Sequence, residues 1–237
     1  MKNYRFFNFI AIALATFLLS SCLKDNDDQR VPMALFTMVN GYSDANAVIY
    51  YADGGALQNP NYPMEFKSYR PIVGLFTGAR KIAVSAEYNS ILTDTTITVK
   101  DSTIYTSFLF GTKAKPVQVI TTDRINKDIK NTETGLRFFN FAEGTDMVSL
   151  KIGDQASPSE WTNRAKETQN SASAHQGFIA QKSGTFTVTA RDKAGKTIAT
   201  RSDIKLVEGY YYSLILIGKA NDEKKPLYIG LVAQAAN

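Results

Sequence analysis

The chain has 237 residues, of which 44% are hydrophobic and 21% are charged. This composition is typical of a folded globular protein and excludes an intrinsically disordered chain. The length fits one large domain or two of ordinary size. The formal charge of +5 is scattered along the chain, without a basic stripe or an aromatic-rich RNA motif. We therefore expect no nucleic-acid partner.

The N-terminal segment has the three parts of a secretory signal. Lys2 and Arg5 give it a positive start, an apolar stretch covers residues 6–19 (FFNFIAIALATFLL), and two serines follow. As a helix, these 14 residues would reach only about 21 Å, short of the roughly 30 Å hydrocarbon core of a membrane. We expect residues 1–21 to be removed as a signal peptide. An uncleaved membrane helix is the alternative.

The only cysteine of the chain, Cys22, follows Leu19-Ser20-Ser21. This pattern resembles a bacterial lipobox, in which the leader is cut before the cysteine and the cysteine takes acyl chains on its sulfur and its new amine. Two or three acyl chains anchor a protein lastingly, whereas a single chain binds only marginally. The resemblance implies that lipid on Cys22 attaches the protein to the membrane. The alternative is an ordinary secretory leader with an incidental cysteine.

An acidic run follows the cysteine, formed by Lys24, Asp25, Asp27 and Asp28. It resembles the short export signal by which Bacteroidota send lipoproteins to the cell surface. The resemblance implies an outer-membrane lipoprotein displayed at the surface. The alternative is that residues 22–34 are only a solvated flexible tether, in which residues 23–34 would span about 19 Å.

The remaining chain contains an internal repeat, since four blocks of the first half recur in the same order in the second half. The block pairs are LFTMVNGYSDANAVIYY with GLRFFNFAEGTDMVSLKI, KIAVSAEY with TFTVTARD, ITVKDSTIYTSFLFG with IKLVEGYYYSLILIG, and KAKPVQVI with EKKPLYIG. The matched positions include Asn40 with Asn140, Tyr105 with Tyr212, and Gly111 with Gly218. We expect the asparagines to bond turn backbone groups and the tyrosines to be core or corner residues whose hydroxyls bond the backbone.

Each block has the residue pattern of β-strands. Phe186, Val188 and Ala190 alternate with threonines, which is typical of a strand buried on one face. The continuous apolar runs IYTSFLFG and YYYSLILIG suit central strands covered on both faces. Residues 157–169 (SPSEWTNRAKETQ) are the one helix candidate. The pattern predicts an all-β fold of two tandem β-sandwich domains, residues 35–124 and 135–237, joined by a polar linker at residues 125–134.

Several of these motifs resemble the family called domain of unknown function 4397. The first copy carries VNGYSDANAVIYY, SYRPIVGLFTGARKIAV, ILTDTT and IYTSFLFG, and the second carries RFFNFAEGTDMVSLKI and YYYSLILIG. The resemblance covers residues 32–237 and implies Ig-like antiparallel β-sandwich modules of secreted and lipid-anchored bacterial proteins. It transfers no catalytic residue, because the family has no established activity.

The sequence predicts no catalytic residue, no cofactor and no metal site. Phosphate-loop, zinc-protease and nucleophile-elbow motifs are absent from it. The single histidine, His175, has small polar neighbours and is expected in an exposed loop. We therefore expect a protein that is not an enzyme. A hydrolase with two acids across a cleft is a distant alternative.

Aromatic residues are the remaining candidates for a binding site. Tyr62, Tyr69 and Trp161 fall in predicted loops or strand edges, where their rings would stack on a sugar. The alternative is that these rings cap the ends of the sandwiches. The sequence thus predicts a non-catalytic, surface-attached lipoprotein in binding, adhesion or spacing, with an unknown protein or glycan ligand. A second hypothesis is a carbohydrate-binding accessory lipoprotein of a glycan-uptake system.

Overall fold

The computed structural model describes residues 30–86 and 90–236. Contacts divide the chain into an N-terminal unit that ends at Val31 and a compact unit, Pro32–Asn237, which is the one described here. The signal peptide, Cys22 and the acidic run lie outside the described residues. Among the described residues, no helix is long and apolar enough to cross a membrane.

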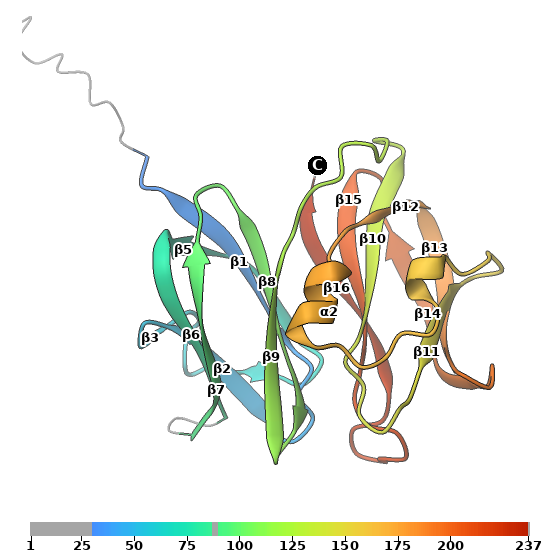
Figure 1. The fold of residues 1–237 in the computed structure, drawn as a ribbon, viewed down its shortest axis with the longest axis horizontal. Helices are drawn as coiled ribbons and strands as arrows, with labels where there is room; N and C mark the ends of the chain where they lie inside the picture. The colour runs from blue at the N-terminus through green and yellow to red at the C-terminus, as the bar shows by residue number, and fades with distance from the viewer. Residues whose placement is uncertain (1–29, 87–89, 237) are drawn as a thin grey trace, which may run out of the picture. The chain divides into compact units, whose positions relative to one another are not determined.

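The first half of the compact unit forms two packed sheets (Figure 1). One sheet has the strand order β5 (Tyr69–Phe76), β1 (Met33–Asn40), β8 (Ile104–Thr112), β9 (Lys115–Thr122). The other has the order β3 (Gly55–Ala56), β2 (Ala47–Ala52), β6 (Gly78–Ala86), β7 (Ser90–Val99), with β4 (Met64–Glu65) paired to β2. Buried side chains of both sheets, including Phe36, Tyr50 and Val84, form one core between them.

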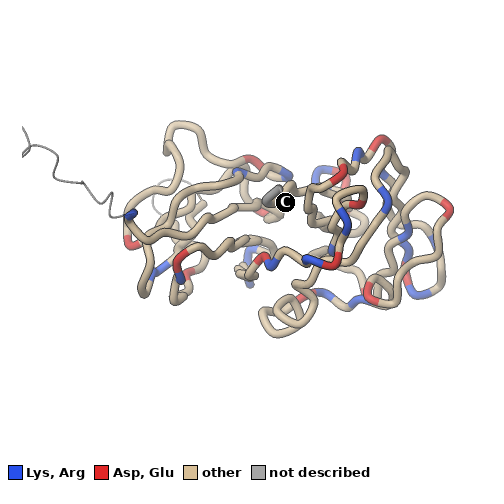
Figure 2. Tube along the Cα trace, turned by 90° about the horizontal axis from the view of Figure 1, so that it is seen from above, with Lys and Arg blue, Asp and Glu red and all other residues tan. Residues whose placement is uncertain are grey.

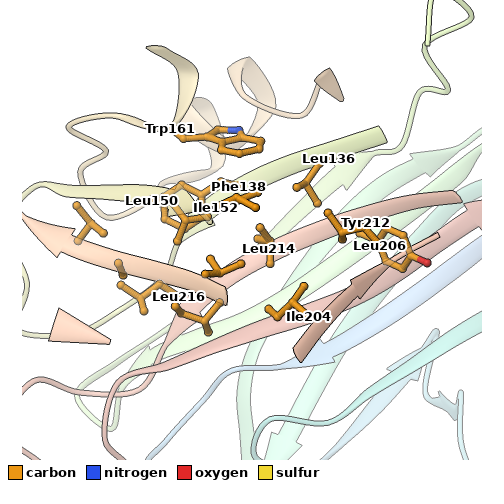
Figure 3. Packing of buried hydrophobic residues seen from close by; sticks show 14 of the residues in the cluster. Leu136, Phe138, Leu150, Ile152, Trp161, Ile204, Leu206, Tyr212, Leu214 and Leu216 are labelled. Atoms are coloured by element: carbon orange, nitrogen blue, oxygen red, sulfur yellow. The ribbon is translucent and has the colours of Figure 1, made fainter. Parts of the chain in front are cut away.

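The second half repeats this arrangement. One sheet has the order β12 (Ile179–Lys182), β10 (Glu133–Asn140), β15 (Tyr210–Ile217), β16 (Tyr228–Ala236). The other has the order β11 (Val148–Ile152), β13 (Gly184–Asp192), β14 (Thr197–Leu206). Their core includes Phe138, Leu150 and Trp161, and Figure 3 shows the Trp161 ring above Phe138 at one end of the packed side chains.

The predicted all-β sandwich fold is confirmed, with one difference in strand direction. The first strand of each half pairs in parallel with the long apolar strand, β1 with β8 and β10 with β15. The other pairings between described strands are antiparallel. The division into domains at residues 35–124, 125–134 and 135–237 remains a proposal, and β10 already begins within the predicted linker.

The two halves repeat each other down to single hydrogen bonds. Asn40 lies opposite Leu109, and its amide donates to the Met64 carbonyl at 2.8 Å. Asn140 lies opposite Leu216, and its amide donates to the Arg164 carbonyl at 3.0 Å. Each amide oxygen also accepts the backbone N–H two residues further on. Both asparagines therefore satisfy turn backbone groups, as predicted.

The matched glycines Gly111 and Gly218 end the long apolar strands in the same left-handed conformation, with φ of +100° and +90°. A Cβ atom on Gly111 would lie 2.4 Å from the Lys115 carbonyl oxygen, and one on Gly218 would lie 2.2 Å from the Pro226 carbonyl oxygen. Only glycine fits this turn without moving backbone.

The prediction of a helix over residues 157–169 was wrong. Within it, the structure has only a single 3₁₀ turn, η2 (Ser159–Trp161), and the α-helix α2 (Gln169–Ala174) starts at its last residue. Thr168 caps α2 through a reciprocal bond with Ser171. The segment before it has Trp161 as a large buried apolar residue, whereas its buried residues Arg164 and Glu167 are charged. It therefore lacks the repeating apolar face that a longer helix would pack against a core.

The outward faces of β8 and β15 are also buried, as their continuous apolar runs predict. Side chains of both halves meet in an inter-sandwich cluster made of Val39, Phe108, Phe110, Val119, Phe139, Phe141, Ala172, Ile215, Ile217 and Val232. The rings of Phe108 and Phe139 lie 5.2 Å apart, and those of Phe110 and Phe141 lie 4.4 Å apart. These aromatic contacts hold the two sandwiches against each other.

The helix α2 protects the edge strand β9 (Figure 1). The side-chain amide of Gln169 donates to the Ile120 carbonyl at 2.8 Å and accepts the Ile120 N–H at 2.9 Å. The Gln176 side chain accepts the Thr122 N–H at 2.9 Å. Two glutamines thus take the place of a neighbouring strand, which removes an edge that would otherwise be free to pair with another chain.

We expect the protein to lose stability as the pH rises above about 10. Tyr50 is fully buried and donates to the Val39 carbonyl at 2.9 Å, and burial raises the pKa of its hydroxyl above the ordinary value. The hydroxyl therefore ionises at lower pH in the unfolded chain than in the folded protein. Above pH 10 this lowers the free energy of unfolding by up to about 1.4 kcal/mol per pH unit. Urea unfolding from pH 8 to pH 11.5 should show a shallower alkaline decline in Tyr50→Phe, and equal declines would contradict this.

Candidate ligand-binding face

The predicted lipidation and export residues, Cys22, Lys24, Asp25, Asp27 and Asp28, lie outside the described residues. They stay predictions.

The structure separates the three aromatic residues predicted to stack on a ligand. Trp161 is only 2% exposed and belongs to the core of the second sandwich, where it also lines a small hollow beside His175. Tyr62 is 68% exposed in the turn between β3 and β4, and Tyr69 is 36% exposed at the start of β5. A stacking role for Trp161 would require the ring to leave its core, whereas Tyr62 and Tyr69 remain accessible.

A tyrosine that the sequence analysis did not single out, Tyr51, lies on the outer face of a sheet of the first sandwich. In β2, Val48 and Tyr50 point into the core, so the alternation of a strand places Tyr51 on the outer face of the sheet. Tyr51 lies directly opposite Ala83 of β6, and Ala83 lies opposite Asp94 of β7. The three residues therefore form one row across the outer face. The same period-two rule, applied to AVIYYA, would have found Tyr51 from the sequence.

The turn after β2 fixes this row in place. Asp53 and Gly54 both have positive φ, +50° and +87°, and connect the paired residues Ala52 and Gly55 as a two-residue hairpin turn. The Asp53 carboxylate accepts the Lys81 N–H at 2.8 Å. This bond, followed by one from the Arg80 guanidinium, holds the pKa of Asp53 below its usual value. The turn is thereby tied to β6 beside the row.

The outer face is hollowed around Ala83. Tyr51, Gly54, Lys81, Ala83, Ser85, Ile91 and Asp94 line an open cavity of about 440 Å³. The Lys81 ammonium and the Asp94 carboxylate form an ion pair at 2.9 Å, with 58% and 45% of their side chains exposed. The cavity thus combines an aromatic ring, a small floor residue and a pair of compensating charges.

Ser85 adds an unusual feature to the floor of this cavity. The residue is 1% exposed, and its hydroxyl oxygen has no hydrogen-bond partner in the described structure. An unsatisfied buried hydroxyl carries a desolvation cost of about 1–3 kcal/mol, so proteins seldom keep one without a reason.

Two other hollows have different characters. An open one of about 540 Å³ lies between the start of β8 and the end of β9, where Lys100, Asp123 and Arg124 contribute charges of both signs. A small one of about 180 Å³ lies beside His175, whose side chain is 39% exposed, as expected, and whose Nδ1 lies 2.6 Å from an Arg164 nitrogen. Glu167 bonds both Arg164 and Ser171 there, so these side chains already satisfy one another.

Charged residues of both signs are distributed along the part of the chain that the structure describes (Figure 2). Figure 2 shows Lys and Arg positions interspersed with Asp and Glu positions along the described trace. Within residues 30–86 and 90–236, no three His, Cys, Asp or Glu side chains are grouped so that they could share a metal ion.

A family model matches the first half of the chain. Residues 34–151 match the family described as "Domain of unknown function (DUF4397)", which confirms the resemblance seen in the sequence for these residues. The match covers the first sandwich and continues through β10 and nearly all of β11. No curated protein sequence matches the chain.

Solved structures show only remote likeness. A carbohydrate-binding module of family CBM26 from Eubacterium rectale Amy13K, in complex with maltoheptaose, is 11% identical with a TM-score of 0.27, covering 83% of this chain and 96% of that one. A Bacteroides uniformis protein with a suggested role in cell adhesion is 10% identical with a TM-score of 0.25, covering 88% and 98%. The glucan-utilisation protein SGBP-B of Bacteroides ovatus is 13% identical with a TM-score of 0.14, covering 72% and 40%. At such scores, none of these likenesses assigns a ligand to this chain.

Proposed function

We propose that this protein, which carries a DUF4397 domain at residues 34–151, is a non-catalytic binding protein of the bacterial cell envelope. Lipid on Cys22 would hold it on the outer membrane, and the acidic run would direct it to the cell surface. The two sandwiches would then present a binding face to the surroundings.

The observation that carries this proposal is the hollowed outer face of the first sandwich. Tyr51, Ala83 and Asp94 lie in one row there, around a cavity of about 440 Å³. Binding cavities of 300–1,000 Å³ with a few placed polar groups are typical of small-molecule sites. Adhesion or binding therefore accounts for a feature that a simple spacer would not need.

A second candidate function is that of a carbohydrate-binding accessory lipoprotein in a glycan-uptake system. The partly buried Tyr51 ring and the compensated charges of the same face favour it over a purely structural role, because a tyrosine offers both an apolar surface and a polar tip to a ligand.

We expect Cys22→Ser to abolish membrane attachment. The serine hydroxyl replaces the thiol that accepts the lipid, so the protein should either leave the membrane fraction or accumulate with its leader uncut. Fractionation of cells expressing the full chain, with immunoblotting of each fraction, measures this directly. Full membrane retention of a leader-cleaved Cys22→Ser protein would contradict lipid anchoring.

The export signal needs a separate variant. Replacing Lys24, Asp25, Asp27 and Asp28 with alanine should leave the lipid in place but keep the protein from the cell surface. The matched control replaces the uncharged tether residues Asn26 and Gln29 with alanine. Protease treatment and antibody labelling of intact cells report display. If the charge-free variant is cut and labelled as readily as the control, the acidic run is only a tether.

A further inference from the structure

The cavity on the outer face of β2, β6 and β7 has the chemistry of a sugar site. We propose that it is a subsite for one neutral pyranose unit of a saccharide, with Tyr51 as the stacking ring and the Lys81–Asp94 pair as hydrogen-bonding partners of the sugar hydroxyls. This inference rests on the proposed binding function and names the ligand class of the same face.

The spacing of the row fits a single ring. Neighbouring strands lie about 4.8 Å apart, so Tyr51 on β2 and Asp94 on β7 are separated by about 10 Å, with β6 between them. The residue on β6 is Ala83, whose methyl group leaves the gap open. A larger side chain at this position would fill the space between the tyrosine and the carboxylate.

The surfaces of the cavity match the two kinds of surface on a pyranose. A tyrosine ring presents an apolar face that packs against the C–H face of a sugar, while its hydroxyl stays in water. The Asp94 carboxylate accepts hydrogen bonds and the Lys81 ammonium donates them, so together they serve sugar hydroxyls in either role. The exposed Ile91 side chain adds a further apolar contact at the rim.

The charges of the cavity favour a neutral sugar. Lys81 and Asp94 compensate each other at 2.9 Å, so the cavity offers no net positive charge to a carboxylate or a sulfate group. The unpartnered Ser85 hydroxyl is a further polar group of the cavity, and a rotation about its χ1 bond would turn it toward a ligand hydroxyl. A bound saccharide would then satisfy a group that the protein leaves without a partner.

The corresponding sheet of the second sandwich lacks this combination. The outer positions of β11 and β13 are held by Ser149, Lys151, Thr189 and Arg191, which pair across the two strands. That face carries two positive charges and no aromatic ring on these strands. The proposed sugar site therefore belongs to the first sandwich alone.

The test uses the chain from Asp25 to Asn237, which contains the whole compact unit, on immobilised neutral glucan, mannan, xylan and galactan oligosaccharides. Polygalacturonate and heparan sulfate serve as acidic probes. We expect the chain to bind at least one neutral series, and Tyr51→Ala to weaken that binding at least tenfold, whereas Tyr51→Phe keeps it within about threefold. Tyr62→Ala, which removes a more exposed ring elsewhere, should bind as the wild type does. Equal thermal midpoints of the variants show that the fold is intact.

Ser85→Ala separates a binding role from a structural one. Its thermal midpoint should stay the same or rise, because an unsatisfied hydroxyl is removed, while saccharide binding weakens about fivefold. Unchanged affinity in Tyr51→Ala, binding confined to the acidic probes, or no binding to any saccharide would each overturn the inference. None of these results tests membrane attachment through Cys22. The fractionation experiment tests that part of the proposed function separately.

Discussion

Arg137→Ala should lower the free energy of unfolding by about 3–5 kcal/mol. The Arg137 guanidinium is 1% exposed, and one of its nitrogens lies 2.6 Å from the carboxylate of Asp123, which is also buried. Burial lowers the pKa of the guanidinium below its ordinary value, and the neighbouring Asp123 carboxylate offsets part of that shift. Removing the cation leaves the buried carboxylate without its ionic partner. An uncompensated buried charge of this kind is the main reason why breaking one side of a buried pair destabilises a fold.

The ion pair is part of a network that joins the two sandwiches. Asp123 directly follows β9 and lies 2.5 Å from the Thr106 hydroxyl of β8, whereas Arg137 belongs to β10 and donates to the Ser213 hydroxyl of β15 at 2.8 Å. Gln234 of β16 connects Thr106 with Ser213. Because the network draws on strands of both halves, Arg137→Ala should also loosen the contact between them.

Urea unfolding at pH 7 measures the loss of unfolding free energy in Arg137→Ala. Two further variants show whether this loss comes from the buried ion pair. Lys193→Ala removes an ion pair between Lys193 and Asp146 whose side chains are 68% and 62% exposed, so the midpoint should not change. The double variant Arg137→Met with Asp123→Leu removes both charges together and should recover most of the stability lost in Arg137→Ala. A single variant as stable as the wild type would show that the pair contributes nothing to the fold.

The strand pattern and the repeat could be predicted because both are local properties of the sequence. Period-two alternation follows from backbone geometry, so Val188 is buried and Thr187 exposed, as the pattern requires. Asn40 and Asn140 were predicted to bond turn backbone groups, and each does so at the end of its first strand. Tyr105 was predicted to be a buried residue bonded to backbone, and its hydroxyl accepts the Lys100 N–H at 3.2 Å.

The docking of the two sandwiches could not be predicted, because it depends on side chains far apart in the sequence. Phe108 and Phe139 belong to apolar runs that suit any strand covered on both faces. Neither run indicates that the two rings pack against each other. Arg137 interrupts the apolar run GLRFFN, and a buried cation of this kind requires a buried partner. Its partner, Asp123, stood at the border of the predicted polar linker.

The proposed binding face was not predicted, for a related reason. The sequence pattern favours aromatic residues in predicted loops or strand edges, namely Tyr62, Tyr69 and Trp161. Trp161 closes a core, because the turn η2 directs its ring inward. Tyr51 stands within a strand, and its importance depends on Ala83 and Asp94, which only the pairing of β2, β6 and β7 brings beside it.

Val188→Asp should destabilise the protein by roughly 4 kcal/mol or more. Val188 is 0% exposed at the centre of β13, in a core it shares with Leu150 and Ile204. The cluster itself is apolar, and the cation opposite Val188, Arg201 on β14, already donates to the Ile229 carbonyl at 2.9 Å. An aspartate at position 188 would therefore bring a charge into an apolar core. Urea unfolding of the variant, compared with the wild type, measures the cost.

Thr187→Asp is the matched control, since it places the same carboxylate one residue away on the exposed face of the same strand. Its cost should stay below about 1 kcal/mol, because the new charge remains in water. The difference between the two variants isolates burial from any effect of aspartate on the strand itself. Equal costs would contradict this assignment of the faces of β13.

Because β13 lies in the second sandwich, a fully destabilised Val188→Asp protein that keeps a folded first half would also support two separate domains. A single concerted loss would instead show that the inter-sandwich cluster couples the two halves.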